Sequence, residues 1–206
     1  MKEADVYSEL ASIRSLMERS SKFISLSGLS GVMAGIYALI GSFFAYRILY
    51  KNAGALTNPN FEAYTPEVWP RLTIIAFIVL ILSVSTGLAL SARQAKKEGQ
   101  SFWNPVSRRL FARMTVPLIT GGLFIIILLS HDDFHLIAPA CLLFYGLSLV
   151  AGSHYTFSDV KWLGMCEIGL GLFCAALPGY GLLFWAFGFG ILHILYGSIM
   201  HFKYKQ

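Results

Sequence analysis

Apolar residues in this chain gather into six long tracts that are separated by short polar connections. The tracts cover residues 23–50, 69–91, 110–130, 134–155, 160–177 and 180–201. A helix needs about 20 mostly apolar residues to cross roughly 30 Å of hydrocarbon, and most of the tracts are close to that length. Because none of them alternates regularly between apolar and polar residues, helices are expected rather than the strands of a barrel. The pattern predicts an all-α, polytopic membrane helix bundle with six transmembrane helices.

The amino-acid composition points the same way. Of the 206 residues, 56% are hydrophobic and 13% are charged, which is too apolar a balance for an ordinary soluble domain. No connection is long enough to hold a separate folded module. We therefore expect one transmembrane domain over residues 23–203, in direct contact with the lipid bilayer.

The segment 1–22 carries an amphipathic pattern. Its apolar residues Val6, Leu10, Ile13 and Met17 follow one another at spacings of four, three and four, as on one face of a helix. This predicts a short N-terminal amphipathic cytoplasmic helix that lies in the membrane interface or packs under the bundle. A helix that continues the first span inward is the alternative.

Basic residues are concentrated in every second connection. The largest group lies between the second and third tracts, in the basic loop (residues 93–113): Arg93, Lys96, Lys97, Arg108, Arg109 and Arg113. Since positively charged loops stay in the cytoplasm, the expected orientation is N-in and C-in. The net charge of +5 would then meet anionic lipid head groups, and no nucleic acid is expected as a partner. The basic loop is also a candidate contact for a cytoplasmic protein.

Small residues form a regular seam along the first tract. The seam recurs at spacings of 4, 3, 4, 3 and 4 and consists of Ser27, Gly31, Ala34, Ala38, Gly41 and Ala45. Small side chains let two helix backbones approach closely in lipid. The seam therefore predicts a tight helix contact, either with a neighbour in the bundle or with a second copy in a homo-oligomer.

An acid and a histidine interrupt the last two tracts at similar depth. Glu167 lies eight residues after Asp159, and His193 lies ten residues before Lys203. At ~1.5 Å per residue these positions are about 12 and 15 Å from the inner surface. An ionised carboxyl inside the membrane costs about 2.5–3.5 kcal/mol, so pairing or protonation is expected. We predict that Glu167 and His193 form a pair, in contact or joined by one water, or share a cavity. The pair could relay protons, hold a polar substrate, contribute to a metal site, or simply join two helices.

A second polar cluster lies on the other side of the membrane, between the third and fourth tracts. It contains His131, Asp132, Asp133 and His135, all of which are metal-ligand types. Their spacing matches no specific metal motif, and either aspartate would also make an ordinary N-cap for the next helix. Both interpretations stay open from the sequence.

Motifs of familiar enzymes are missing from the sequence. It contains no Walker loop, no His-Glu-x-x-His zinc motif, no Gly-x-Ser-x-Gly elbow and no Cys-x-x-Cys pair. The cofactor is therefore unknown. An ATP-driven pump or a familiar hydrolase is not expected, and the balance leans against an enzyme.

Two stretches carry a resemblance to other proteins. They are Glu18-Arg19-Ser20-Ser21-Lys22-Phe23 running into Ser27-Gly28-Leu29-Ser30-Gly31, and Gly188-Phe189-Gly190-Ile191-Leu192-His193. Over its whole length the chain resembles uncharacterised bacterial six-helix integral membrane proteins. The resemblance implies a bacterial cytoplasmic (inner) membrane and brings no activity and no functional residues.

Three classes of function follow from these patterns. The first is a small transporter or proton- or ion-coupled carrier with Glu167 and His193 as its mid-membrane site. The second is a non-catalytic membrane sensor or assembly partner that uses the segment 1–22 and the basic loop. The third is a membrane enzyme, which the small extramembrane surface disfavours.

Overall fold

The computed structural model describes residues 27–49 and 68–204 of the chain. The predicted N-terminal helix and most of the connection between the first two tracts lie outside the described residues. The helices are α2 (Gly28–Leu49), α3 (Trp69–Lys97), α4 (Pro105–Ser130), η2 (Phe134–Leu136), α5 (Ile137–Gly152), η3 (Ser153–Tyr155), α6 (Ser158–Ala176), α7 (Gly181–Trp185), η4 (Ala186–Leu192) and α8 (His193–Lys203). No strand is present among these residues, so the described part of the fold is all-α.

Among residues 27–49 and 68–204, five segments are long and apolar enough to cross a membrane. They are Gly28–Leu49, Trp69–Lys97, Pro105–Ser130, Phe134–Tyr155 and Gly181–Lys203. The sixth predicted crossing, α6, has 19 residues but includes Asp159, Lys161 and Glu167. These ionisable residues lower its apolar character, and length and composition alone do not identify α6 as a span.

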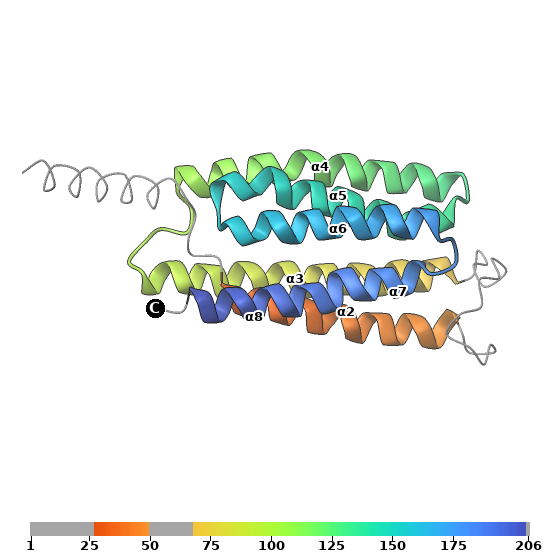
Figure 1. The fold of residues 1–206 in the computed structure, drawn as a ribbon, viewed down its shortest axis with the longest axis horizontal. Helices are drawn as coiled ribbons and strands as arrows, with labels where there is room; N and C mark the ends of the chain where they lie inside the picture. The colour runs from red at the N-terminus through yellow and green to blue at the C-terminus, as the bar shows by residue number, and fades with distance from the viewer. Residues whose placement is uncertain (1–26, 50–67, 205–206) are drawn as a thin grey trace, which may run out of the picture.

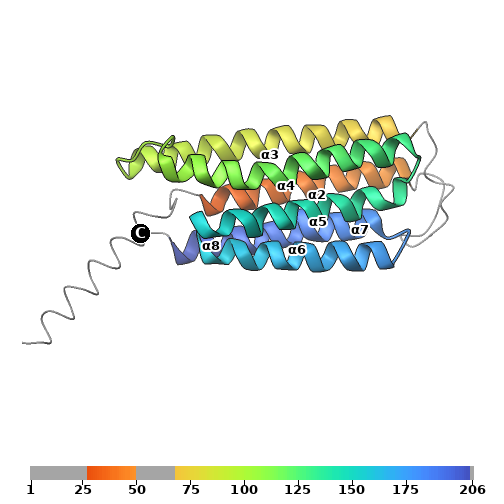
Figure 2. The ribbon, with the colours of Figure 1, turned by 90° about the horizontal axis from the view of Figure 1, so that it is seen from above.

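The helices form two layers of three (Figures 1 and 2). One layer consists of α4, α5 and α6, with α5 packed between its two neighbours. The other contains α3, α2 and the C-terminal segment Gly181–Lys203, with α2 in the middle. As a result, α3 and α4 lie at one edge of the bundle, and α6 and α8 lie together at the opposite edge.

Within the first layer, α5 and α6 touch through their backbones at two glycines. A β-carbon on Gly164 would lie 2.8 Å from the carbonyl oxygen of Gly146, and one on Gly146 would lie 2.7 Å from the carbonyl oxygen of Gly164. Neither distance leaves room for a side chain. Glycine at both positions therefore lets the two helices pack in direct backbone contact.

Within the second layer, α2 and the C-terminal segment pack in the same way. A β-carbon on Gly197 would lie 2.5 Å from the backbone nitrogen of Val32, and one on Gly35 would lie 2.6 Å from the carbonyl oxygen of Gly190. Gly31 of the small-residue seam also faces Gly197. Gly41 instead faces Val79 of α3. The seam thus meets two neighbours within the same chain.

Local sequence explains where α4 begins. The side-chain oxygen of Asn104 accepts hydrogen bonds from the backbone N–H groups of Val106 and Ser107, both at 2.9 Å. Ser107 returns a contact to the backbone of Asn104, which completes a capping box. Pro105 follows at the first helical position, where a missing N–H is harmless. Pro117 lies inside α4 without interrupting it.

The two layers are also joined near the ends of the bundle. At one end Lys203 donates to both carboxylate oxygens of Asp159 at 3.0 Å, and the hydroxyl of Tyr204 donates to the same carboxylate at 2.7 Å. Partial burial tends to raise the pKa of Asp159, but the hydrogen bonds from Tyr204 and Lys203 outweigh it and hold the pKa below its usual value. At the other end Trp69 stacks on Phe134, with ring centroids 4.6 Å apart.

The glycine contact between α5 and α6 can be tested with two substitutions in the same helix. Gly164→Ala should lower the free energy of unfolding by about 1–3 kcal/mol. The new methyl group would clash with the backbone of α5, which can only move away together with the whole helix. Gly169→Ala should be neutral or stabilising by up to ~1 kcal/mol, because nothing lies within 4 Å of its β-position. Thermal unfolding in detergent measures both. Equal effects at the two sites would contradict the backbone contact.

Candidate functional site

A large cleft runs between the two layers. Its volume is about 1010 Å³, and residues of α2, α3, α4, α5, α6 and the C-terminal segment line it. Most of the lining is aliphatic or aromatic. No Asp, Glu, Lys or Arg is found among the lining residues in the described part of the chain. The cleft is therefore an uncharged, lipid-like space inside the bundle.

The small-residue seam forms one wall of this cleft. All six of its members contribute to the lining: Ser27, Gly31, Ala34, Ala38, Gly41 and Ala45. Ala38 and Ala45 are buried, with exposed fractions of 1% and 7%. The seam therefore has two structural consequences: it allows close helix contacts, and it leaves space beside α2 where larger side chains would fill the cleft.

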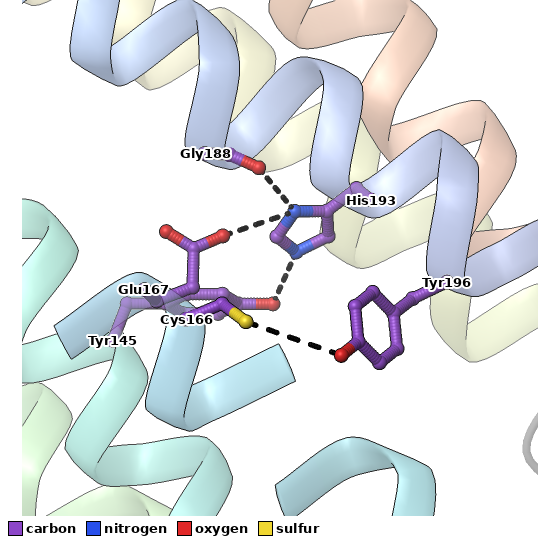
Figure 3. A network of polar contacts seen from close by, with 6 residues as sticks. All are labelled: Tyr145, Cys166, Glu167, Gly188, His193 and Tyr196. Atoms are coloured by element: carbon purple, nitrogen blue, oxygen red, sulfur yellow. Dashed lines mark hydrogen bonds and ion pairs between the residues drawn. The ribbon is translucent and has the colours of Figure 1, made fainter. Parts of the chain in front are cut away.

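A tyrosine and a histidine that line the cleft are joined by a hydrogen bond, which Figure 3 shows. The hydroxyl of Tyr145, on α5, lies 2.8 Å from Nε2 of His193, the first residue of α8. The other ring nitrogen, Nδ1, lies 3.0 Å from the carbonyl oxygen of Gly188. Because a carbonyl oxygen can only accept, Nδ1 carries a proton and donates it. In the neutral ring Nε2 then accepts the hydrogen bond of Tyr145.

Glu167 lies behind His193, away from the cleft. Its Oε1 is 3.5 Å from Nδ1 of His193, and its exposed fraction is 0%. Neither carboxyl oxygen has a hydrogen-bond partner among the described residues. The structure thus brings together the two residues that the sequence placed at equal depth. Only His193 of the two reaches the cleft.

Gly188 makes room for this carboxyl group. A β-carbon at Gly188 would lie 2.6 Å from Oε2 of Glu167 and 2.6 Å from a methyl carbon of Leu142. Any larger residue at this position would displace the acid. Gly188 therefore serves the site twice, through its carbonyl oxygen and through its missing side chain.

A π-helix positions Gly188 and His193. The segment η4, Ala186–Leu192, has π-helical geometry and leads directly into α8. Such wider turns are rare and often occur at functional sites. The sequence did not predict η4, although the closely spaced Gly188 and Gly190 were a signal of unusual backbone. Tyr145 was also missed, because a tyrosine in an apolar helix resembles an ordinary packing residue.

The second polar cluster is arranged differently. His131 follows the last turn of α4, and Asp133 occupies the N-cap position of η2 without a capping hydrogen bond from its side chain. Asp132 adopts a positive φ of 59°. Within residues 27–49 and 68–204 no group of three or more His, Cys, Asp or Glu side chains is placed to hold a metal ion. His135 does line the cleft.

The site combines a buried acid, an imidazole and a phenol in one line from protein interior to cleft. An acid enclosed in this way is stable as the neutral form or beside an imidazolium, and a lone ionised carboxyl would be costly. The arrangement can bind a small polar group and can pass protons between its members. Comparison of the chain with known protein-family models, curated proteins and solved structures gives no match.

The Tyr145–His193 hydrogen bond can be tested by a double-mutant cycle. Tyr145→Phe should lower the free energy of unfolding by about 1 kcal/mol. His193→Ala should cost about 2–4 kcal/mol, because it removes a buried ring and leaves two polar groups unpaired. The double variant should cost less than the sum by at least about 0.5 kcal/mol.

Tyr37→Phe is the matched control for this cycle. Its hydroxyl lies 3.3 Å from Thr86, in the contact between α2 and α3, and not at His193. Combined with His193→Ala, it should be additive to within about 0.5 kcal/mol. Additivity in both cycles, measured by thermal unfolding in detergent, would show that Tyr145 and His193 act independently.

Proposed function

We propose that the protein is a small integral membrane carrier, built of six membrane-crossing helices, whose mid-membrane site is formed by Tyr145, His193 and Glu167. The observation that carries this proposal is the fully enclosed carboxyl of Glu167, 3.5 Å from a histidine whose other nitrogen is held by Tyr145 in the wall of a large cleft. Intramembrane ionisable residues commonly mark substrate or proton pathways.

The three side chains would handle protons coupled to transport. A proton taken up at the cleft reaches Tyr145, whose own proton passes to Nε2 of His193, and the Nδ1 proton of His193 then passes to an ionised Glu167. One O–H or N–H bond forms for each that breaks. One proton is thereby moved from the cleft to the acid, and His193 is left with its proton on Nε2 instead of Nδ1. The 2.8 Å hydrogen bond between Tyr145 and Nε2 supports the first transfer, and the 3.5 Å separation of Nδ1 and Oε1 places the acid next to the second donor.

The division into two layers also suits a carrier. In each layer one helix pair is held by backbone contacts at glycines, α5 with α6 and α2 with the C-terminal segment, whereas the space between the layers is a cleft. Contacts that close its ends include the Asp159–Lys203 ion pair and the Trp69–Phe134 stack. Such limited contacts between rigid units are what rocking motions in alternating access require.

The proposal includes the N-in, C-in orientation in a bacterial cytoplasmic membrane. Basic residues of the described chain are concentrated at one end of the bundle, where α3 ends, α4 and α6 begin and α8 ends: Arg93, Lys96, Lys97, Arg108, Arg109, Arg113, Lys161 and Lys203. The other end carries Arg47 and Arg71. This asymmetry supports a cytoplasmic location for the basic end.

Cysteine labelling tests the orientation. In a variant without the three native cysteines, Gln100→Cys should react with a membrane-impermeant maleimide only after the cytoplasmic face is opened. His131→Cys should react in intact cells, because it lies at the opposite end of the bundle. Both positions are exposed. Reaction of both from the same side would overturn the proposed topology.

Infrared spectroscopy tests whether Glu167 exchanges a proton. Difference spectra of the reconstituted protein between acidic and alkaline buffer should contain the carbonyl-stretch band of a protonated carboxyl that Glu167→Gln abolishes. Asp132→Asn, a surface acid whose backbone conformation also suits Asn, should keep this band. If no band depends on Glu167 at any pH at which the protein stays folded, the acid is structural and the proton-coupled carrier is wrong.

A structural role for Glu167 would favour the second function, a membrane assembly or sensor protein. The basic residues of the segment 93–113 lie on the last turns of α3 and the first turns of α4, not in a loop as the sequence suggested. They are all exposed and do not line the cleft. They support a contact with a cytoplasmic protein or with anionic lipid. The outward face of α3 is apolar and exposed, which would suit lipid or a second copy of the chain.

A further inference from the structure

We propose that the cleft binds a neutral, elongated lipophilic molecule whose single polar end is a hydroxyl group that donates a hydrogen bond to Tyr145. This inference rests on the proposed carrier function and names its substrate class. It follows from the charge of the lining, the length and depth of the cleft, and the hydrogen-bond state of His193.

The lining excludes ions and highly polar solutes. Among the described lining residues no side chain carries a formal charge, and most contribute only carbon atoms. A volume of about 1010 Å³ is at the upper end of ordinary ligand pockets, roughly 300–1000 Å³. A solvated ion or sugar would leave most of this surface unpartnered, whereas a hydrocarbon chain would cover it.

The shape of the cleft calls for an extended chain. Its lining residues on α2 run from Gly28 to Leu49, which at 1.5 Å per residue spans about 30 Å. The small residues of the seam leave this wall without large side chains. A molecule whose polar end lies at Tyr145, close to mid-membrane, therefore extends along about half of this length and is narrow, like a single lipid chain.

The depth of His193 in the membrane determines which polar group the ligand can carry. His193 lies ten residues from Lys203, about 15 Å from the inner end of the helix and close to mid-membrane. A charged phosphate or ammonium group would be strongly disfavoured at this depth without a charged partner in the lining. A neutral group such as a hydroxyl can be placed there with one or two hydrogen bonds.

The hydrogen bonds within the site determine whether the ligand must donate or accept a hydrogen bond. Nδ1 of His193 donates to the carbonyl oxygen of Gly188, so Nε2 of the neutral ring accepts from Tyr145. The hydroxyl proton of Tyr145 is thereby engaged in the hydrogen bond to His193. The remaining lone pairs of the Tyr145 oxygen can only accept a hydrogen bond. A ligand bound at Tyr145 must supply a proton, which a hydroxyl does and an ether or ester does not.

The molecule would reach the cleft from the bilayer. At one edge of the bundle α6 packs against α8, which closes that side. At the other edge α3 packs on α2 and α4 packs on α5 (Figure 2). Both α3 and α4 contribute residues to the lining of the cleft. A lipophilic molecule can therefore pass sideways between α3 and α4 without crossing water.

The test uses two photoreactive probes that differ in one group. One is a long-chain primary alcohol with a diazirine in mid-chain, and the other is its methyl ether. The full-length protein in lipid nanodiscs is labelled over a range of probe concentrations, and the labelled peptides are mapped. We expect saturable labelling of cleft-lining residues, with the alcohol favoured over the ether by about two- to tenfold, the worth of one hydrogen bond.

Three variants define the site. Tyr145→Phe should remove the preference for the alcohol and leave the binding of the ether unchanged. Gly122→Phe should abolish saturable labelling by both probes, because Gly122 lines the cleft and its β-position is open, so the ring can enter without a clash. Gly169→Phe is the matched control, since its β-position is also open but it does not line the cleft.

The outcomes separate this inference from the carrier proposal. Unsaturable labelling, labelling that is equal in Gly122→Phe and Gly169→Phe, or equal binding of the two probes to the unmodified protein would each overturn the hydroxyl ligand. A Glu167-dependent infrared band would still support the proton-coupled carrier in that case. Conversely, saturable, Tyr145-dependent labelling without such a band would support the ligand and reject proton coupling.

Discussion

Direct backbone contact at glycines is the constraint on which the described structure depends. Lipid offers no hydrophobic drive for helices to associate, so close packing must supply the attraction. Gly146 and Gly164 provide it between α5 and α6, and Gly35, Gly190 and Gly197 provide it between α2 and the C-terminal segment. These contacts lie within the layers. Each layer is therefore tightly packed by itself, and a cleft can remain between them.

The same contacts set the geometry of the site. Tyr145 directly precedes Gly146, and Glu167 lies less than one helical turn after Gly164. His193 lies between the two glycines of the C-terminal segment that touch α2. Each functional side chain is thus attached close to a fixed crossing point, where the backbone has little freedom. Preorganisation of this kind suits a site whose partners must stay within hydrogen-bond distance.

The sequence predicted the parts of this arrangement that depend on local pattern. The apolar tracts predicted the long helices, and five of the six predicted spans are long and apolar enough to cross a membrane. The depths of Glu167 and His193 followed from counting residues along two helices joined by a short turn. Small-residue spacing identified α2 as a helix with close neighbours.

Features that arise between distant segments could not be obtained in this way. Tyr145 joins the site because α5 crosses α6 at a particular height. The sequence of a single apolar tract does not determine where two helices cross. The π-helix of η4 depends on packing around Gly188 and Glu167, and single-sequence periodicity assumes regular turns. The cleft requires the relative placement of two layers. The metal interpretation of the cluster at His131 depended on side-chain directions that residue types alone do not give.

A cryo-electron microscopy map of the protein in native-like lipid, with co-purified molecules identified by mass spectrometry, tests the central claim most directly. The account predicts elongated density between α3 and α4 that ends at the hydroxyl of Tyr145, with Tyr145, His193 and Glu167 in one connected line. An α3 helix packed against α4 with no space between the layers would contradict it. So would a separation of more than about 7–10 Å between Glu167 and His193, beyond which such groups act independently.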